Sequence, residues 1–139
     1  MPIVSVTRLR LRSIRFLPLF FFHTQRVIAQ IRKSDGHLGG AVKSDDNLTY
    51  WTITLWRDDI AMRAFAASGA HRSAMQHVQD WCSEAGVVHW VQDEASLPDW
   101  PAAVRRLREE GRATKLRHPS PNHAGLDYTA PSGGYSMRL

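Results

Sequence analysis

The sequence predicts a single domain of the α+β class, and three observations support this prediction. The chain has 139 residues, of which 43% are hydrophobic and 22% are charged, as in a globular protein with one core. Several short stretches alternate apolar and polar residues, which is the period of a β-strand. In the stretches between them, apolar residues recur every three or four positions, which is the period of an amphipathic helix.

The first element is a predicted strand over residues 3–12. Leu9 and Leu11 point to one face of this strand, and the arginines between them point to the other. Ser13 is suited to cap a helix that follows. That helix is predicted over about residues 14–33, because apolar residues continue along one side at helical spacing.

A hairpin is predicted next. Residues 37–43 form a short strand with Gly39-Gly40 at its centre, a position where glycine often marks a bulge. Residues 45–47 supply the turn, and a second strand runs over residues 48–57. Large side chains occupy both faces of this second strand, so we expect it to be central and covered on both sides.

In the second half of the sequence, the pattern predicts a broken helix and another strand. A helix begins after Asp58 or Asp59 and stops at Ser68-Gly69, after which helical spacing resumes. A helix with prolines near its start and then a short strand follow. The predicted ranges are a helix over about 60–67, a helix over 70–84, a strand over 87–92, a helix over about 96–110 and a short strand over 112–116.

The order strand, helix, strand, strand, helix, strand is the ferredoxin-like βαββαβ arrangement. It predicts a four-stranded antiparallel sheet with helices on one face, and we expect a second subunit to cover the other face. We assign residues 1–117 to this domain, with its core in 2–93 and an extra helix near 96–110. Residues 118–139 are a Pro-, Gly- and Ser-rich C-terminal extension.

Composition narrows the class of protein. The only cysteine, Cys82, excludes an internal disulfide and is predicted to pack as a small apolar group. The apolar run over residues 16–22 follows several arginines, but it is too short to span a membrane and no cleavage site follows it. We therefore expect a cytoplasmic protein with no membrane span.

The net charge is +5 and the pI is about 10.0. The basic residues are spread over both ends of the chain and do not alternate with aromatics as in a single-strand binding surface. The sequence therefore predicts no nucleic-acid partner.

Three segments carry a resemblance to a known family: the strand Trp51-Thr52-Ile53-Thr54-Leu55-Trp56, the helix Ala61-Met62-Arg63-Ala64-Phe65 and residues 68–75. They resemble the dimeric α/β-barrel superfamily, and within it small bacterial proteins related to antibiotic-biosynthesis and spheroidene-type monooxygenases. The resemblance covers about residues 2–93. It implies a homodimer through the sheet face and a pocket between the sheet and its helices. It also implies several chemistries, including cofactor-independent oxygenation, haem-dependent reactions, dehydration and isomerisation, so fold alone does not decide function.

His71 is the candidate catalytic residue, because it follows the helix break and can reach the mouth of such a pocket. Its imidazole suits a general base or a haem ligand. The alternative is that Ser68-Gly69 is only a kink and that His71 is a packed or capping residue. Large aromatics are the candidate substrate-binding residues, or else ordinary core residues: Trp51, Trp56, Phe65, Trp81 and Phe20.

No metal site is predicted, because His77 lies six residues after His71 and two ligands on one helical face need a spacing of three or four. Asp58 and Asp59 are explained by capping. Our hypothesis is a monooxygenase-like enzyme acting on a hydrophobic, aromatic, polyketide-like or terpenoid-like substrate, with haem or with no cofactor. The alternative is a non-catalytic small-molecule-binding or accessory protein that uses the same pocket.

Overall fold

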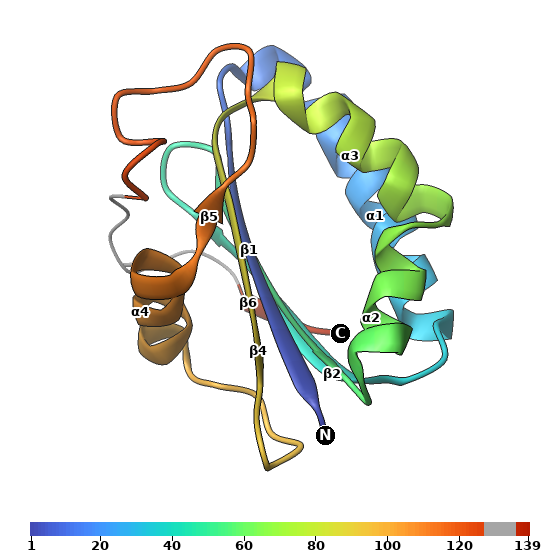
Figure 1. Ribbon diagram of the computed structural model, residues 1–139. Helices are drawn as coiled ribbons and strands as arrows, with labels where there is room; N and C mark the ends of the chain where they lie inside the picture. The colour runs from blue at the N-terminus through green and yellow to red at the C-terminus, as the bar shows by residue number, and fades with distance from the viewer. Residues whose placement is uncertain (127–135) are drawn as a thin grey trace.

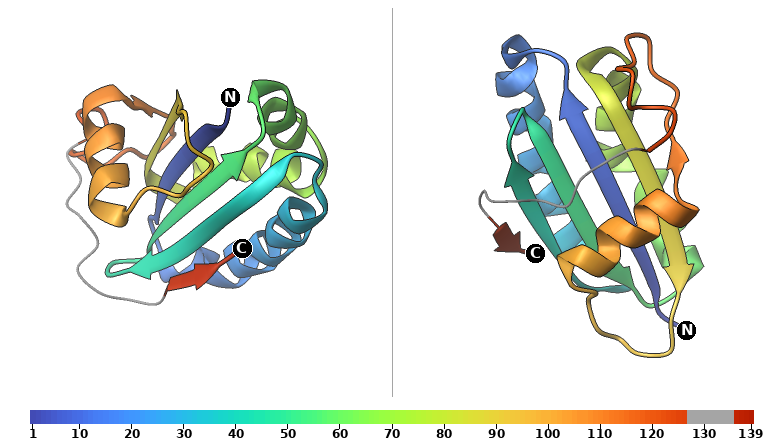
Figure 2. Two further views of the ribbon diagram at one scale, coloured as in Figure 1. Left: turned by 90° about the horizontal axis from the view of Figure 1, so that it is seen from below. Right: turned by 90° about the vertical axis from the view of Figure 1, so that its left-hand side faces the viewer.

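The computed structural model describes residues 1–126 and 136–139 and confirms the α+β class. A twisted antiparallel sheet forms the middle layer, with α1, α2 and α3 on one side and α4 on the other (Figures 1 and 2). A 3-10 turn over Ile14–Phe16 precedes α1. The elements are β1 (Ile3–Leu11), α1 (Leu17–Lys33), β2 (His37–Asp45), β3 (Thr49–Trp56), α2 (Asp59–Ala66), α3 (Gly69–Trp81), β4 (Cys82–Val91), α4 (Trp100–Glu110), β5 (Arg112–Ala113) and β6 (Ser136–Arg138).

The sheet order is β5-β4-β1-β3-β2-β6. Its four central strands, β4-β1-β3-β2, have the predicted ferredoxin-like arrangement, and the register of β2 against β3 shifts between His37 and Gly39, where the glycines predicted a bulge. The prediction of only four strands is wrong for the part of the chain that the structure describes. The short strands β5 and β6 extend the sheet at its two edges.

The prediction that helices lie on one face only is also wrong. The buried residues Ala103, Val104 and Leu107 of α4 pack against Val4 and Trp51, on the face away from α1, α2 and α3. This face needs cover because alternate residues of β1 and β3 are apolar on it. α4 supplies that cover from within the chain, where the sequence led us to expect a second subunit.

The second half of the broken helix is shorter than predicted. α3 ends at Trp81 and β4 begins at Cys82, whereas helical spacing had suggested a helix as far as Glu84. Cys82 pairs with Leu11 of β1, and Glu84 pairs with Arg10. Strand pairing and burial of these residues therefore outweigh the local helical pattern. Burial raises the pKa of the Cys82 thiol to about 12, which fits the predicted packing role.

The C-terminal segment folds back along the sheet on the α4 side. The Ser120 N–H donates to Ser83 O at 2.8 Å, and the Ala85 N–H donates to Nδ1 of His123 at 3.2 Å. The part of the predicted extension over residues 127–135 lies outside the described residues. None of the helices that the structure describes is long and apolar enough to cross a membrane.

Candidate active site

A polar band crosses the helix-facing side of the sheet, between two apolar clusters. Ile3 and Trp56 belong to one cluster, and Leu11 belongs to the other. The positions between them on β1 and β3 carry hydroxyl side chains, paired across the strands in register. These residues are Ser5, Thr7, Thr52 and Thr54.

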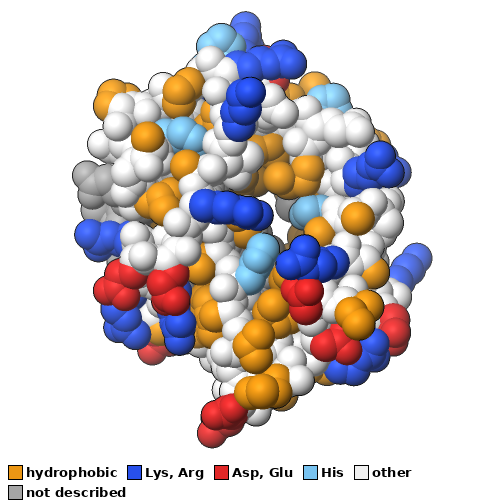
Figure 3. Space-filling view, in the orientation of Figure 1, with side chains coloured by type: hydrophobic (Ala, Val, Ile, Leu, Met, Phe, Trp, Pro, Cys, Tyr) orange, Lys and Arg blue, Asp and Glu red, His pale blue; other side chains and the backbone are white. Residues whose placement is uncertain are grey.

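Short hydroxyl side chains leave space that α1, α2 and α3 do not fill. Ser5, Thr7 and Thr52 are accordingly only half-buried, although they lie at the centre of the sheet. Figure 3 shows the surface hollowed between the sheet and these helices, with His and with Lys or Arg side chains around the opening. The hollow lies where the sequence analysis expects a pocket.

His71 lies in the first turn of α3, directly after the chain breaks between α2 and α3. α2 ends at Ala66, and Gly69 begins α3 with a φ of 58°, a backbone conformation that glycine tolerates best. The break leaves the Ala66 carbonyl unpaired within its helix and directs it at the next turn. Nδ1 of His71 lies 2.9 Å from this carbonyl oxygen.

The bond to Ala66 determines the tautomer of His71. A carbonyl oxygen can only accept a hydrogen bond, so Nδ1 must carry the proton and donate. Nε2 therefore holds the lone pair, and none of the described residues bonds to it. Burial lowers the pKa of His71 from its ordinary value of 6.5, and the bond to Ala66 offsets part of that shift. Near neutral pH, Nε2 is available as a proton acceptor.

Gln30 of α1 holds the helix break in place. Its Oε1 accepts from the His71 N–H at 2.8 Å, and its Nε2 donates to Ser68 O at 2.9 Å and to Phe65 O at 3.2 Å. A Cβ added to Gly69 would lie 3.2 Å from the Gln30 amide carbon, so the glycine also permits this close approach. One amide thus connects the end of α2, the break and the start of α3.

Aromatic rings form one wall beside His71. The imidazole packs on the Phe65 ring with 4.7 Å between centroids, and Phe65 stacks on Trp56 at 5.0 Å. Trp56 is fully buried and its Nε1 has no hydrogen-bond partner among the described residues. His37 contacts Trp56 edge-on, at 5.4 Å between ring centroids.

A second histidine, His89, lies on the helix-facing side of β4, opposite Ser5 in the register. It is exposed, and its pKa is lowered first by partial burial and then by the positive charges of Arg112 and Arg63. Asp59, which pairs with Arg63 at 2.6 Å, opposes that shift. The charged groups that act on His89 are therefore predominantly cationic.

The structure brings some of the predicted site residues together and separates others. His71, Phe65 and Trp56 form one contiguous group. Phe20 and Trp81 lie in the apolar cluster at the far end of the polar band. Trp51 lies on the opposite face of the sheet, fully buried against α4, so it cannot line the same hollow.

Sequence reasoning missed Gln30 and the four hydroxyl residues of the band. A signal for the hydroxyl residues was present, because Ser5, Thr7, Thr52 and Thr54 occupy alternate positions of two predicted strands and must share a face when those strands pair. No comparable signal marks Gln30. Its partner His71 is 41 residues away in the chain, and a single glutamine in a helix has no distinctive pattern.

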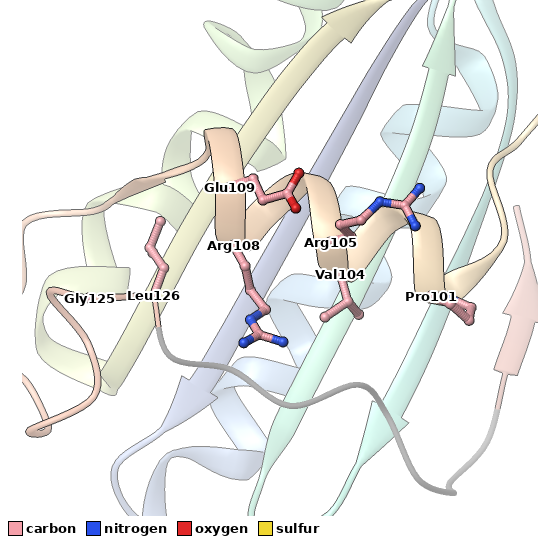
Figure 4. Close-up of a pocket in the computed structure, with 7 residues that line it drawn as sticks. All are labelled: Pro101, Val104, Arg105, Arg108, Glu109, Gly125 and Leu126. Carbon is pink, nitrogen blue, oxygen red and sulfur yellow. The ribbon is translucent and has the colours of Figure 1, made fainter.

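A second cavity of about 720 Å³ lies along α4, on the far side of the sheet from His71. Figure 4 shows the side chains of Val104, Arg108 and Leu126 along its wall. No histidine or cysteine belongs to the lining that the structure describes. The charged side chains in this lining are those of Arg105, Arg108 and Glu109.

Metal and haem binding have different support among the residues that the structure describes. Over residues 1–126 and 136–139, no group of three or more His, Cys, Asp or Glu side chains could hold a metal ion. Nε2 of His71 would be the group that holds the iron of a haem, and a bound haem would supply oxygen activation there. No step proposed below passes through haem.

Comparison with solved structures shows the same fold in several monooxygenase-like proteins. A mutant of SnoaB from Streptomyces nogalater, described as a cofactor-independent oxygenase, aligns with a TM-score of 0.56 and 15% identity, over 70% of this chain and 98% of SnoaB. A proposed antibiotic-biosynthesis monooxygenase from Nitrosomonas europaea aligns with a TM-score of 0.57 and 15% identity, over 66% of this chain and 89% of the other. A protein from Mycobacterium tuberculosis aligns with a TM-score of 0.60 and 20% identity, over 69% and 100%.

These identities are low, so the likeness shows the fold and leaves the activity open. It confirms the predicted resemblance to the monooxygenase-like, ferredoxin-like superfamily at the level of fold. Among curated proteins, none matches this sequence. A family model described as "Domain of unknown function (DUF3291)" matches residues 24–119.

Proposed function

We propose that this chain, which belongs to the family described as "Domain of unknown function (DUF3291)", is a monooxygenase-like enzyme. It acts on a hydrophobic aromatic substrate of polyketide or terpenoid type, and His71 is its general base. The observation that carries this proposal is the hydrogen bond from Nδ1 of His71 to the Ala66 carbonyl. That bond leaves Nε2 as the proton acceptor beside an aromatic wall.

The proposed reaction needs only this base, oxygen and an electron-rich phenol. Nε2 of His71 takes the phenolic proton, and the phenolate then gives electrons to O₂. One oxygen atom enters the ring as a carbonyl and the other leaves as water, so the phenol becomes a quinone. The substrate supplies all four electrons that O₂ accepts, so the balance needs no further reductant.

The lining supports an aromatic substrate with polar substituents. Phe65 and Trp56 offer an apolar wall next to His71, and Phe20 and Trp81 lie at the far end of the band. Between the two ends, the hydroxyl groups of Thr7 and Thr52 can bond to oxygen atoms on the substrate. Trp51 takes no part in this proposal because it packs on the other face of the sheet.

The proposal is tested by oxygen consumption and quinone formation with electron-rich phenols, in the presence of a metal chelator. His71→Gln removes the base while keeping a polar side chain of similar length, and we expect it to lower kcat by about 10²–10⁴-fold. The control is His77→Gln, an exposed histidine of the same helix, which should retain wild-type turnover.

Three outcomes would contradict the proposal. Equal loss in both variants would point to damage of α3 and not to a role for His71. A Soret band in the purified protein would replace the cofactor-free reaction with a haem-dependent one. Tight binding of aromatic ligands to a folded protein without any turnover would favour the non-catalytic binding protein.

A homodimer belongs to this proposal, because the resemblance to dimeric α/β barrels implies one. The sheet face that such a dimer would use is occupied here by α4. A contact between two copies on this side must therefore include the outer surface of α4, where Arg105, Arg108 and Glu109 are exposed.

A further inference from the structure

The beginning of α1 carries an exposed apolar surface. Four large apolar side chains within nine residues are each more than half exposed, although isolated surface hydrophobics are ordinary and clusters are not. We call this set the α1 patch. It comprises Ile14 (71% exposed), Leu19 (55%), Phe21 (62%) and Phe22 (57%).

Exposed arginines lie beside the α1 patch. Residues 1–34 contain six arginines and one lysine but no aspartate or glutamate, and of these Arg8 and Arg10 pair with Glu84 on the α4 side of the sheet. Arg15 and Arg26 are exposed, and the Arg26 guanidinium lies 5.8 Å from the centroid of the Phe22 ring. The nearby carboxylate of Asp80 on α3 lies 3.6 Å from the guanidinium of Arg12. The patch therefore combines exposed aromatic rings with positive charge.

We propose that the α1 patch docks the protein on the surface of a bilayer that contains anionic lipid. Phenylalanine and leucine side chains can enter the boundary between head groups and acyl chains, and arginines beside them can meet lipid phosphates. Figure 2 shows the beginning of α1 at one end of the molecule, away from α4, where a flat surface can approach it. The helix would lie on the membrane and not cross it.

The charge of the α1 patch favours an anionic bilayer over a second copy of the chain as its binding partner. Two copies meeting through the α1 patch would place Arg15 and Arg26 of one copy against the same cationic region of the other. Like charges across an interface oppose association, whereas an anionic lipid surface attracts the same residues. The docking proposal does not depend on the proposed oxygenase activity.

The test is flotation of the full chain with two kinds of vesicle, phosphatidylcholine alone and phosphatidylcholine mixed with phosphatidylglycerol. We expect the wild-type protein to float with the mixed vesicles and to be released by added salt. Phe21→Glu with Phe22→Glu should weaken binding by about tenfold or more, because the rings no longer enter the head-group region. Arg15→Gln with Arg26→Gln should weaken it by about fivefold for each arginine.

The matched control is Ile60→Glu, which makes the same kind of change at a side chain that is 79% exposed on α2. It should bind the mixed vesicles nearly as well as the wild type. Failure of the wild type to float, or equal flotation with both vesicles, would overturn the proposal. So would a wild-type dimer that the double glutamate variant converts to a monomer, since a second copy would then cover the patch. If that variant unfolds, the arginine variant still decides the question.

Discussion

At the scale of single residues, the direction of one hydrogen bond decides which nitrogen of His71 can act. The Ala66 carbonyl can only accept, so Nδ1 keeps its proton and Nε2 becomes the base. The Gln30 amide holds the backbone of His71 through a bond of 2.8 Å. His71 acts on the substrate in our proposal, whereas Gln30 is a positioning residue.

The positioning role predicts a specific effect of Gln30→Leu. The substitution removes the acceptor of the His71 N–H and one donor to each of the Ser68 and Phe65 carbonyls, which keep their bonds from backbone N–H groups. We therefore expect unfolding to need about 1–3 kcal/mol less free energy. The pKa of His71, followed by NMR, should also move as the ring changes its surroundings. Gln25→Leu, at an exposed glutamine of the same helix, is the control and should change neither quantity. An unchanged His71 titration in Gln30→Leu would contradict the positioning role.

The pKa values of four histidines allow a prediction of how stability depends on pH. The pKa of each is lowered from the ordinary value of 6.5, and burial is the largest cause in every case. The unfolded chain therefore binds protons at a pH where the folded chain does not, and stability must fall as the pH drops through this range. Denaturant unfolding between about pH 7 and pH 5 should show a progressively lower midpoint. A flat profile over this range would show that the histidines are not protected from protonation. The residues concerned are His23, His37, His71 and His89.

At the scale of elements, the start of β4 depends on one buried ion-pair network. Glu84 is 2% exposed and bonds to Arg8, to Arg10 at 3.2 Å and to the Ser120 hydroxyl at 2.8 Å. Burial is the largest single effect on the pKa of Glu84 and raises it, but the bonds to Arg8 and Ser120 and the charges of Arg8 and Arg10 together lower it below its ordinary value. The network joins β1, β4 and the C-terminal segment on the α4 side of the sheet.

Removing the charge of Glu84 should therefore strongly destabilise the folded protein. Glu84→Gln removes the negative charge from the buried ion pair with Arg8, and we expect a loss of about 3–5 kcal/mol in the free energy of unfolding. The control is Glu110→Gln, which removes an exposed partner of Arg106 and should change stability by about 0.5 kcal/mol or less. Similar melting curves for the two variants would contradict the structural role of the network.

At the scale of the whole molecule, α4 makes the sheet the middle of three layers. Ala103 and Leu107 are fully buried against the strands, so this face of the sheet is covered before any second subunit binds. The hollow between the sheet and α1, α2 and α3 lies on the opposite face (Figure 3). The proposed dimer contact and the proposed chemistry would therefore use separate sides of the molecule.

The exposed arginines of α4 allow a prediction of how the proposed dimer would respond to charge reversal. If two copies meet through the outer surface of α4, Arg105→Glu with Arg108→Glu should raise the dissociation constant measured by sedimentation equilibrium at least about tenfold. The variant should keep the wild-type melting temperature, since both side chains are exposed. A dimer that the variant leaves equally stable would place the contact elsewhere.

Much of the fold could be predicted from local patterns. Alternation identified the central strands, and the Ser68-Gly69 break placed His71 at the start of a helix, where the structure has it. The end of α3 could not be predicted in this way. Residues up to Glu84 follow helical spacing, but Cys82 and Ala85 pair with β1 of the sheet. Such pairing joins residues far apart in the chain, and no local pattern reports it.

The sequence by itself determined the order of the elements, the helix break and the candidate base, because periodicity, capping and glycine act within a few residues. Alternation along the predicted strand already put Trp51 and Trp56 on opposite faces. Only the tertiary structure decided that α4 covers the face of Trp51 and that α2 packs on the face of Trp56. It alone also placed Gln30 against a break 38 residues away and Glu84 against Arg8, 76 residues away. Contacts of this kind arise when whole layers pack together, so each depends on every element around it and not on neighbours in the sequence.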